Sequence, residues 1–188
     1  MKIILRLLLV LIASQLTSCA AAVPLSPIEY TQLLSNVKEF FTLSILLLNQ
    51  DSQYCIGQAI TRLYYGHYHI ARLIYNNIKG YDGNSHTVVW NNMPSNIKSY
   101  GEKLKEIRIK YDYGVTEISL EELKSDLEYI RSHQSRFDKM LEEIDSSISR
   151  YGTNPIFISS VNHAIEEIKS TYKSLITTIE NCIENRLS

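Results

Sequence analysis

Residues 52–80 read SQYCIGQAITRLYYGHYHIARLIYNNIKG, and this stretch decides the fold. Its aliphatic side chains recur every three or four residues, which is the spacing of one face of an α-helix. They are Ile56, Ile60, Leu63, Ile70 and Ile74. Asp51-Ser52 can cap the start, and Gly80 readily takes the left-handed conformation that ends a helix. The sequence therefore predicts one long helix from about residue 52 to Lys79.

Four more segments of the chain have the same helical period. The expected helices cover 26–49, roughly 96–110, 120–152, and 154 onward. Ser26 with Glu29, and Ser119 with Glu122, form capping boxes that satisfy the first backbone amides of two of these helices. Between the helices we expect a loop over 81–95, with a short turn around 88–92, and an irregular stretch over 111–119.

The composition of the 188-residue chain is that of one globular domain, with 45% hydrophobic and 21% charged residues. Only 7 Gly and 4 Pro are present, which favours a few long helices over many turns. The predicted fold is all-α, an up-and-down bundle of about five helices over residues 26–187. The formal net charge of −1 excludes a globally basic nucleic-acid binder, so any RNA binding must come from a local patch.

The first 22 residues have the layout of an export signal. Lys2 precedes an apolar run from Ile3 to Ala13, which is too short for the roughly 20 residues of a bilayer crossing. Leu16-Thr17-Ser18-Cys19 resembles a bacterial lipobox, so Cys19 is a candidate for lipidation that would anchor the chain to the cell-envelope membrane. Ordinary cleavage after Ala20-Ala21-Ala22 is an alternative. A mis-assigned start codon ahead of a cytoplasmic protein is a third.

Cysteine spacing gives no sign of a metal site. Cys19, Cys55 and Cys182 form no C-x-x-C motif or Cys/His cluster, so neither a zinc site nor another metal centre is expected. Cys55 and Cys182 both lie on expected helices. They could pair in an oxidising compartment, or serve as small buried hydrophobic residues.

A polar row accompanies the apolar face of the helix over 52–79. It consists of Arg62, Tyr65, His69, Arg72 and Asn76. Arg62 and His69 are seven residues apart, so they nearly share an azimuth and differ by about 10.5 Å in height. His67 lies about 140° around the helix from Arg62 and points elsewhere. Such a row suits anion binding or proton transfer, whereas the alternative is that its members pair with carboxylates of neighbouring helices.

The segment Ala59–Arg72 resembles the R-x-Y-Y-x-x-[FY]-H-x-A-[KR] helix of HEPN domains. Ser85-His86 falls where many members of this superfamily carry Thr/Ser-His after the loop. Arg108–Tyr113 resembles their R-x-x-A-D-Y element, with Tyr111 in place of the usual Ala. The order of the three pieces agrees, and the resemblance spans roughly residues 26–173. The export segment departs from the usual pattern of the family.

The resemblance implies a metal-independent ribonuclease that needs no cofactor and acts at a dimer interface through an Arg-x(4–6)-His motif. Arg62 with His69 meets that spacing, as does Arg62 with His67, and both azimuth and the family pattern favour His69. Residues that would bind the substrate are Tyr65, Arg72, Arg108 and Asp112. In contrast, we expect His86 and Trp90 to pack the loop over the bundle rather than to bind a ligand, and Tyr111-Asp112-Tyr113 to be structural.

Two other functions fit the same residues. Many HEPN proteins on this branch are non-catalytic modules that bind nucleotide, RNA or a protein, often a nucleotidyltransferase or antitoxin partner. An envelope lipoprotein with a structural role is the second alternative, and it follows from the export segment alone. Expected partners therefore include a second copy of the chain, RNA or nucleotide, and the membrane.

Overall fold

The computed structural model describes residues 24–50, 52–83, 85–113, 118–148 and 154–187. This part of the chain contains seven α-helices and no strand. They are α2 (Pro27–Leu48), α3 (Gln53–Lys79), α4 (His86–Asn91), α5 (Ser95–Tyr113), α6 (Leu120–Ser132), α7 (Gln134–Ser147) and α8 (Pro155–Arg186). The all-α prediction is confirmed, with more helices than the five expected. The signal segment 1–22, with Cys19, lies outside the described residues.

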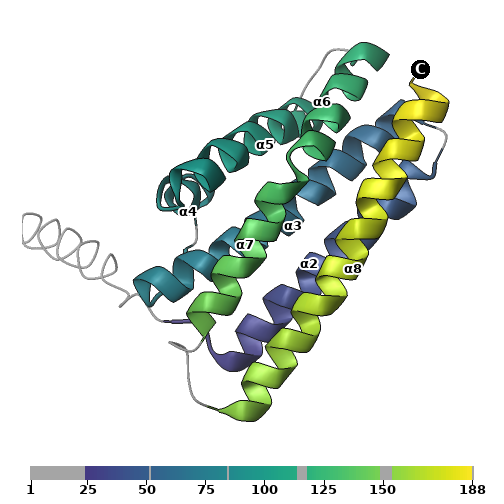
Figure 1. The fold of residues 1–188 in the computed structure, drawn as a ribbon. Helices are drawn as coiled ribbons and strands as arrows, with labels where there is room; N and C mark the ends of the chain where they lie inside the picture. The colour runs from purple at the N-terminus through teal and green to yellow at the C-terminus, as the bar shows by residue number, and fades with distance from the viewer. Residues whose placement is uncertain (1–23, 51, 84, 114–117, 149–153, 188) are drawn as a thin grey trace, which may run out of the picture.

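Helix α3 lies at the centre of the fold, where it contacts α2, α4, α5, α6 and α7. Figure 1 shows α2, α3, α7 and α8 side by side along the long axis, while α4 and α5 cover another side of α3. The Phe41 ring of α2 packs directly on the backbone of α3 at Gly66, where a Cβ atom would overlap the ring. A helix surrounded in this way can expose only a narrow stripe.

The single helix expected over 120–152 is two helices, α6 and α7, separated at His133. Both the Ser132 hydroxyl and the His133 Nδ1 donate to the carbonyl of Tyr129, at 2.9 and 2.8 Å. That carbonyl would otherwise accept the His133 amide, which instead bonds to Ile130 one residue further on, at 3.2 Å. Side chains that compete for backbone partners in this way interrupt a helix. Residues 149–152 lie outside the described part.

The stretches expected as loop are also partly helical. Residues 86–91 form α4, whose Trp90 is buried with its indole N–H donating to the Tyr64 hydroxyl at 3.2 Å. Helix α5 continues to Tyr113, three residues beyond the expected end. The Tyr111 side chain lies against Gly57 of α3 and donates to Asp126 of α6 at 2.6 Å, so these tertiary contacts extend the helix.

Both described cysteines, Cys55 and Cys182, are free. Cys182 is buried in the core, so the reading as a small hydrophobic side chain holds for it. None of the described helices is long and apolar enough to cross a membrane.

Candidate functional site

One narrow stripe of α3 reaches the surface. Between Cys55 and Asn77 the helix has 17 buried residues, and the remaining positions are half-buried at spacings of three and four. Those positions are Cys55, Gln58, Arg62, Tyr65, His69 and Arg72. Four members of the predicted polar row therefore occupy the only side of this part of α3 that a ligand can reach. Asn76, the fifth, is buried instead, and its Oδ1 accepts the Leu25 amide at 3.1 Å.

Arg62 is the charged residue of the stripe that has no carboxylate partner among the described residues. Within the described part of the chain, no hydrogen bond or ion pair involves its guanidinium. Its neighbour Thr61 donates to Asp112 at 3.1 Å, which places this turn of α3 beside α5. A guanidinium without a carboxylate partner presents five donors that match the geometry of phosphate.

His69 is held as a neutral imidazole. Its ring stacks on Phe40 of α2, with centroids 5.5 Å apart and planes at 18°. Burial and the charges of Arg72 and His86 lower its pKa from 6.5 to about 4. Nδ1 is buried and has no hydrogen-bond partner among the described residues. A neutral imidazole can accept a proton at pH 7, which is the protonation state that a general base requires.

His67, the alternative histidine of the motif, belongs to the core. It is fully buried; its Nδ1 donates to the Leu63 carbonyl at 2.9 Å, and its Nε2 accepts from the Tyr100 hydroxyl at 3.1 Å. Burial lowers its pKa to about 4. Both ring nitrogens are occupied, so His67 has no free edge for a substrate and acts as a structural residue.

Two of the expected binding arginines already have carboxylate partners. Arg72 forms a two-point ion pair with Asp82, in which Nε donates to Oδ1 at 2.6 Å. Arg108 pairs with Asp112 on α5 through Nε and Oδ2, 2.5 Å apart, and donates to the Tyr65 hydroxyl at 2.5 Å. Its guanidinium also lies 5.2 Å from the centre of the Tyr65 ring. Arg108, itself paired with Asp112, therefore holds the Tyr65 side chain of the stripe in place.

His86 of α4 lies beside this group, and its contacts pack α4 against α3, as expected for this residue. Its ring stacks on Tyr68 of α3 with centroids 3.8 Å apart and planes at 4°, and Nδ1 lies 2.5 Å from the Tyr64 hydroxyl. The Tyr68 ring also lies 5.7 Å from the ring of His69, so one tyrosine contacts both imidazoles and joins them in one cluster. The Ser85-His86 pair is the sequence signal that marks this residue.

The charge around the cluster favours an anion. Lys105 of α5 donates to Thr87 at 2.8 Å, and within the described residues it has no carboxylate partner. Among the described residues, Arg62 and Lys105 therefore have no carboxylate partner, whereas Arg72 and Arg108 are paired. In the part of the chain that the structure describes, no group of three His, Cys, Asp or Glu side chains could hold a metal ion.

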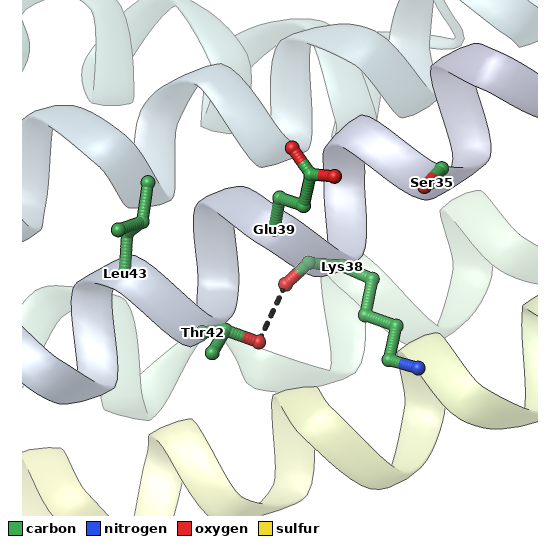
Figure 2. Close-up of a pocket in the computed structure, with 5 residues that line it drawn as sticks. All are labelled: Ser35, Lys38, Glu39, Thr42 and Leu43. Atoms are coloured by element: carbon green, nitrogen blue, oxygen red, sulfur yellow. Dashed lines mark hydrogen bonds between the residues drawn. The ribbon is translucent and has the colours of Figure 1, made fainter.

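A separate hollow lies on the outer side of α2. It is lined by Ser35, Lys38, Glu39, Thr42 and Leu43 (Figure 2). The Thr42 hydroxyl donates to the Lys38 carbonyl at 2.9 Å, and the Lys38 ammonium extends toward α8, where it pairs with Glu167 at 2.7 Å. Because its lysine is already engaged and none of the predicted site residues lines it, this hollow is not the candidate site.

Comparison of the chain with protein-family models, with curated proteins and with solved structures finds no match.

Proposed function

We propose that this protein is an HEPN-type, metal-independent endoribonuclease that works as a dimer. The observation that carries the proposal is the half-buried stripe of α3, in which Arg62, without a carboxylate partner among the described residues, and a neutral His69 both face out of an otherwise buried stretch of helix. Arg62 would hold the non-bridging oxygens of the scissile phosphate. His69 would take the proton of the 2′-hydroxyl as that oxygen attacks phosphorus.

The proposed step balances without a cofactor. The bond from phosphorus to the 2′-oxygen forms and the bond to the 5′-oxygen breaks. The proton that His69 accepts from the 2′-hydroxyl is then given to the departing 5′-oxygen. The products are a 2′,3′-cyclic phosphate and a free 5′-hydroxyl. A positioned acid–base group of this kind contributes about 10²- to 10⁴-fold to a rate.

The proposal needs two copies of the chain, because Arg62 and His69 on one helix are about 10.5 Å apart in height. One protomer would supply the arginine and its partner the histidine. Exposed aliphatic side chains on the neighbouring helix α2, Leu43 and Leu46, offer apolar surface for such a contact.

RNA cleavage by the purified full-length protein in EDTA tests the proposal. We expect the wild type to cut single-stranded RNA, and Arg62→Ala and His69→Ala to lose activity while remaining folded. His163→Ala, at an exposed histidine of α8, is the matched control and should keep full activity. His67→Ala is unsuitable as a control because this side chain is part of the core. RNA that stays intact with the wild type contradicts a ribonuclease.

A non-catalytic binding module is the second candidate. It is favoured by the pairing of Arg72 with Asp82 and of Arg108 with Asp112, which leaves few free cations to stabilise a transition state. In this case the stripe would bind RNA, a nucleotide, or a nucleotidyltransferase or antitoxin partner without cleaving anything. Binding without cleavage would favour it over the ribonuclease.

We also propose that Cys19 is lipidated and anchors the bundle to the cell-envelope membrane. The described chain enters the bundle at Leu25, whose amide is fixed by Asn76 at the end of α3. Two exposed isoleucines lie at this end, Ile28 at the start of α2 (81% exposed) and Ile156 at the start of α8 (77% exposed). The ring contact of Tyr30 with Phe157 places the two helix starts side by side. Apolar side chains at the anchored end suit contact with lipid.

A further inference from the structure

We infer that His86 is a phosphate-binding residue of this site, whose Nε2–H donates to a phosphodiester oxygen of bound RNA. The inference rests on the proposed RNA-binding function and adds a residue from α4 to a site otherwise built on α3. It follows from the tautomer of His86, from the groups around the unbonded edge of its ring, and from the charge of those groups.

A chain of hydrogen bonds fixes the tautomer. An indole nitrogen can only donate, and Trp90 donates to the Tyr64 oxygen at 3.2 Å. The Tyr64 hydroxyl then has its own proton to place, and His86 Nδ1 lies 2.5 Å away. If Tyr64 donates to Nδ1, the Trp90 N–H, the Tyr64 hydroxyl and His86 Nδ1 all have hydrogen-bond partners. The proton of the neutral imidazole must then be on Nε2.

The opposite tautomer leaves a defect. With the proton on Nδ1, the Tyr64 oxygen would accept from both His86 and Trp90, and its own hydroxyl hydrogen would have no acceptor among the described residues. Tyr64 is fully buried. A buried donor without an acceptor is destabilising. The Nε2–H tautomer is therefore preferred, and the face-to-face stack on Tyr68 fixes the orientation of the ring.

The free edge of His86 faces a positively charged region. Titratable or charged groups come from each element around it. On α3 they are Tyr64, Tyr65, Tyr68, His69 and Arg72, and Arg72 is paired with Asp82 of the following loop. On α5 they are Lys105 and Arg108, and Arg108 is paired with Asp112. Lys105 donates to Thr87 and has no carboxylate partner in the part of the chain that the structure describes, so its positive charge is not neutralised there. A fixed N–H beside such a cation is suited to an anionic oxygen.

His86 would bind as a neutral donor rather than as an acid. Burial, with the charges of Arg108 and Lys105, lowers its pKa to about 4, so it carries one ring proton at pH 7. A neutral imidazole does not readily give up that proton. Its contribution is a preorganised hydrogen bond to the phosphate, which complements proton transfer by His69.

Two substitutions separate the outward donor from the inward contact. His86→Asn keeps an acceptor near the Nδ1 position for Tyr64, but cannot reach as far as Nε2. His86→Gln places its amide N–H near the Nε2 position. The probe is a single-stranded 2′-O-methyl oligoribonucleotide, which carries the phosphates but has no 2′-hydroxyl to attack. We expect His86→Asn to weaken its binding by roughly 10-fold or more and His86→Gln to bind nearly as the wild type, since hydrogen bonds to charged groups contribute about 1.5–3 kcal/mol.

Nitrogen-15 NMR of the histidine rings in the full-length protein gives the tautomers directly. We expect Nε2–H for His86 and Nδ1–H for His67. Signals of His67 that are the same in the wild type and in each His86 variant also show that the variant is folded. A His86 proton on Nδ1, equal binding by all three proteins, or no binding by the wild type overturns the inference. Binding of the probe by the wild type without cleavage of ordinary RNA overturns the ribonuclease proposal and leaves the role of His86 standing.

Discussion

The ring of His69 lies nearly parallel to the ring of Phe40, with centroids 5.5 Å apart, so a residue of α2 covers one face of the imidazole on α3. Phe40 also stacks on Tyr65, at 5.6 Å. This apolar cover removes water from the His69 ring. It is the physical reason that burial is the largest cause of the lowered pKa of His69.

We expect Phe40→Ala to raise the pKa of His69 from about 4 toward 6.5, because the charged form regains hydration. A general base must be neutral, so activity is lost as the pH falls through that pKa. The acid limb of the pH–rate profile should therefore move to higher pH in the variant. Phe40→Leu keeps an apolar cover and serves as the control. An acid limb at the same pH in wild type and Phe40→Ala contradicts this role of the stack.

The buried His67 should make the fold sensitive to acid. Its pKa is about 4 in the folded chain and ordinarily 6.5, so the unfolded state binds more protons between these values. Its contribution to stability is complete above pH 6.5 and is lost as the pH falls toward 4. The loss is on the order of 3 kcal/mol for this residue. His69 and His86 act in the same direction because their pKa values are also lowered.

Urea unfolding between pH 7 and pH 4.5 measures this effect. The non-titrating variant His67→Gln should lose less stability over the window than the wild type, whatever its stability at pH 7. Parallel pH dependences of the two proteins would show that protonation of His67 is not linked to unfolding.

Gly66 should tolerate no larger residue. A Cβ atom there would overlap the Phe41 ring, which is packed in the core against His67 and Phe137. We expect Gly66→Ala to destabilise the bundle by about 1–3 kcal/mol, as overpacked cores do. Gln58→Ala, on the half-buried stripe of the same helix, is the control and should change stability little. The two variants are compared by their midpoints of urea unfolding. Equal midpoints for Gly66→Ala and Gln58→Ala would contradict the packing of the Phe41 ring on Gly66.

Labelling of cells with a palmitate analogue tests the anchor. The wild type should incorporate the label, whereas Cys19→Ala should not, because the remaining cysteines, Cys55 and Cys182, are on helices within the bundle. Labelling of both proteins, or of neither, would remove the lipid anchor and with it the membrane-facing role of Ile28 and Ile156.

The helical period was sufficient to predict the stripe but not its length. Arg62, Tyr65, His69 and Arg72 share one side of α3, as their spacing indicated. Asn76 continues the same spacing but is buried, because the segment that leads into α2 lies against it and the Leu25 amide donates to its Oδ1. The period of a helix gives the azimuth of a side chain, whereas a distant segment of the chain decides whether that side chain is covered.

Features that depend on tertiary contacts were not predictable. The break at His133 results from two side chains that bond to the Tyr129 carbonyl, and nothing in the apolar period of 120–152 shows it. The position of His86 depends on the Trp90–Tyr64 contact across α4 and α3. Pairing of Arg72 with Asp82 joins residues ten apart, on a helix and the loop that follows it.

The most direct test of the proposed site is complementation between Arg62→Ala and His69→Ala. Heterodimers of the two variants can be isolated by co-expressing them with different tags and purifying on both in sequence. Each variant alone should be inactive on single-stranded RNA in EDTA. A two-fold dimer that shares its sites across the interface regenerates one intact Arg62/His69 pair, so the heterodimer should recover about half of the wild-type rate. A heterodimer as inactive as its parents, beside an active wild type, would contradict a site shared between two chains.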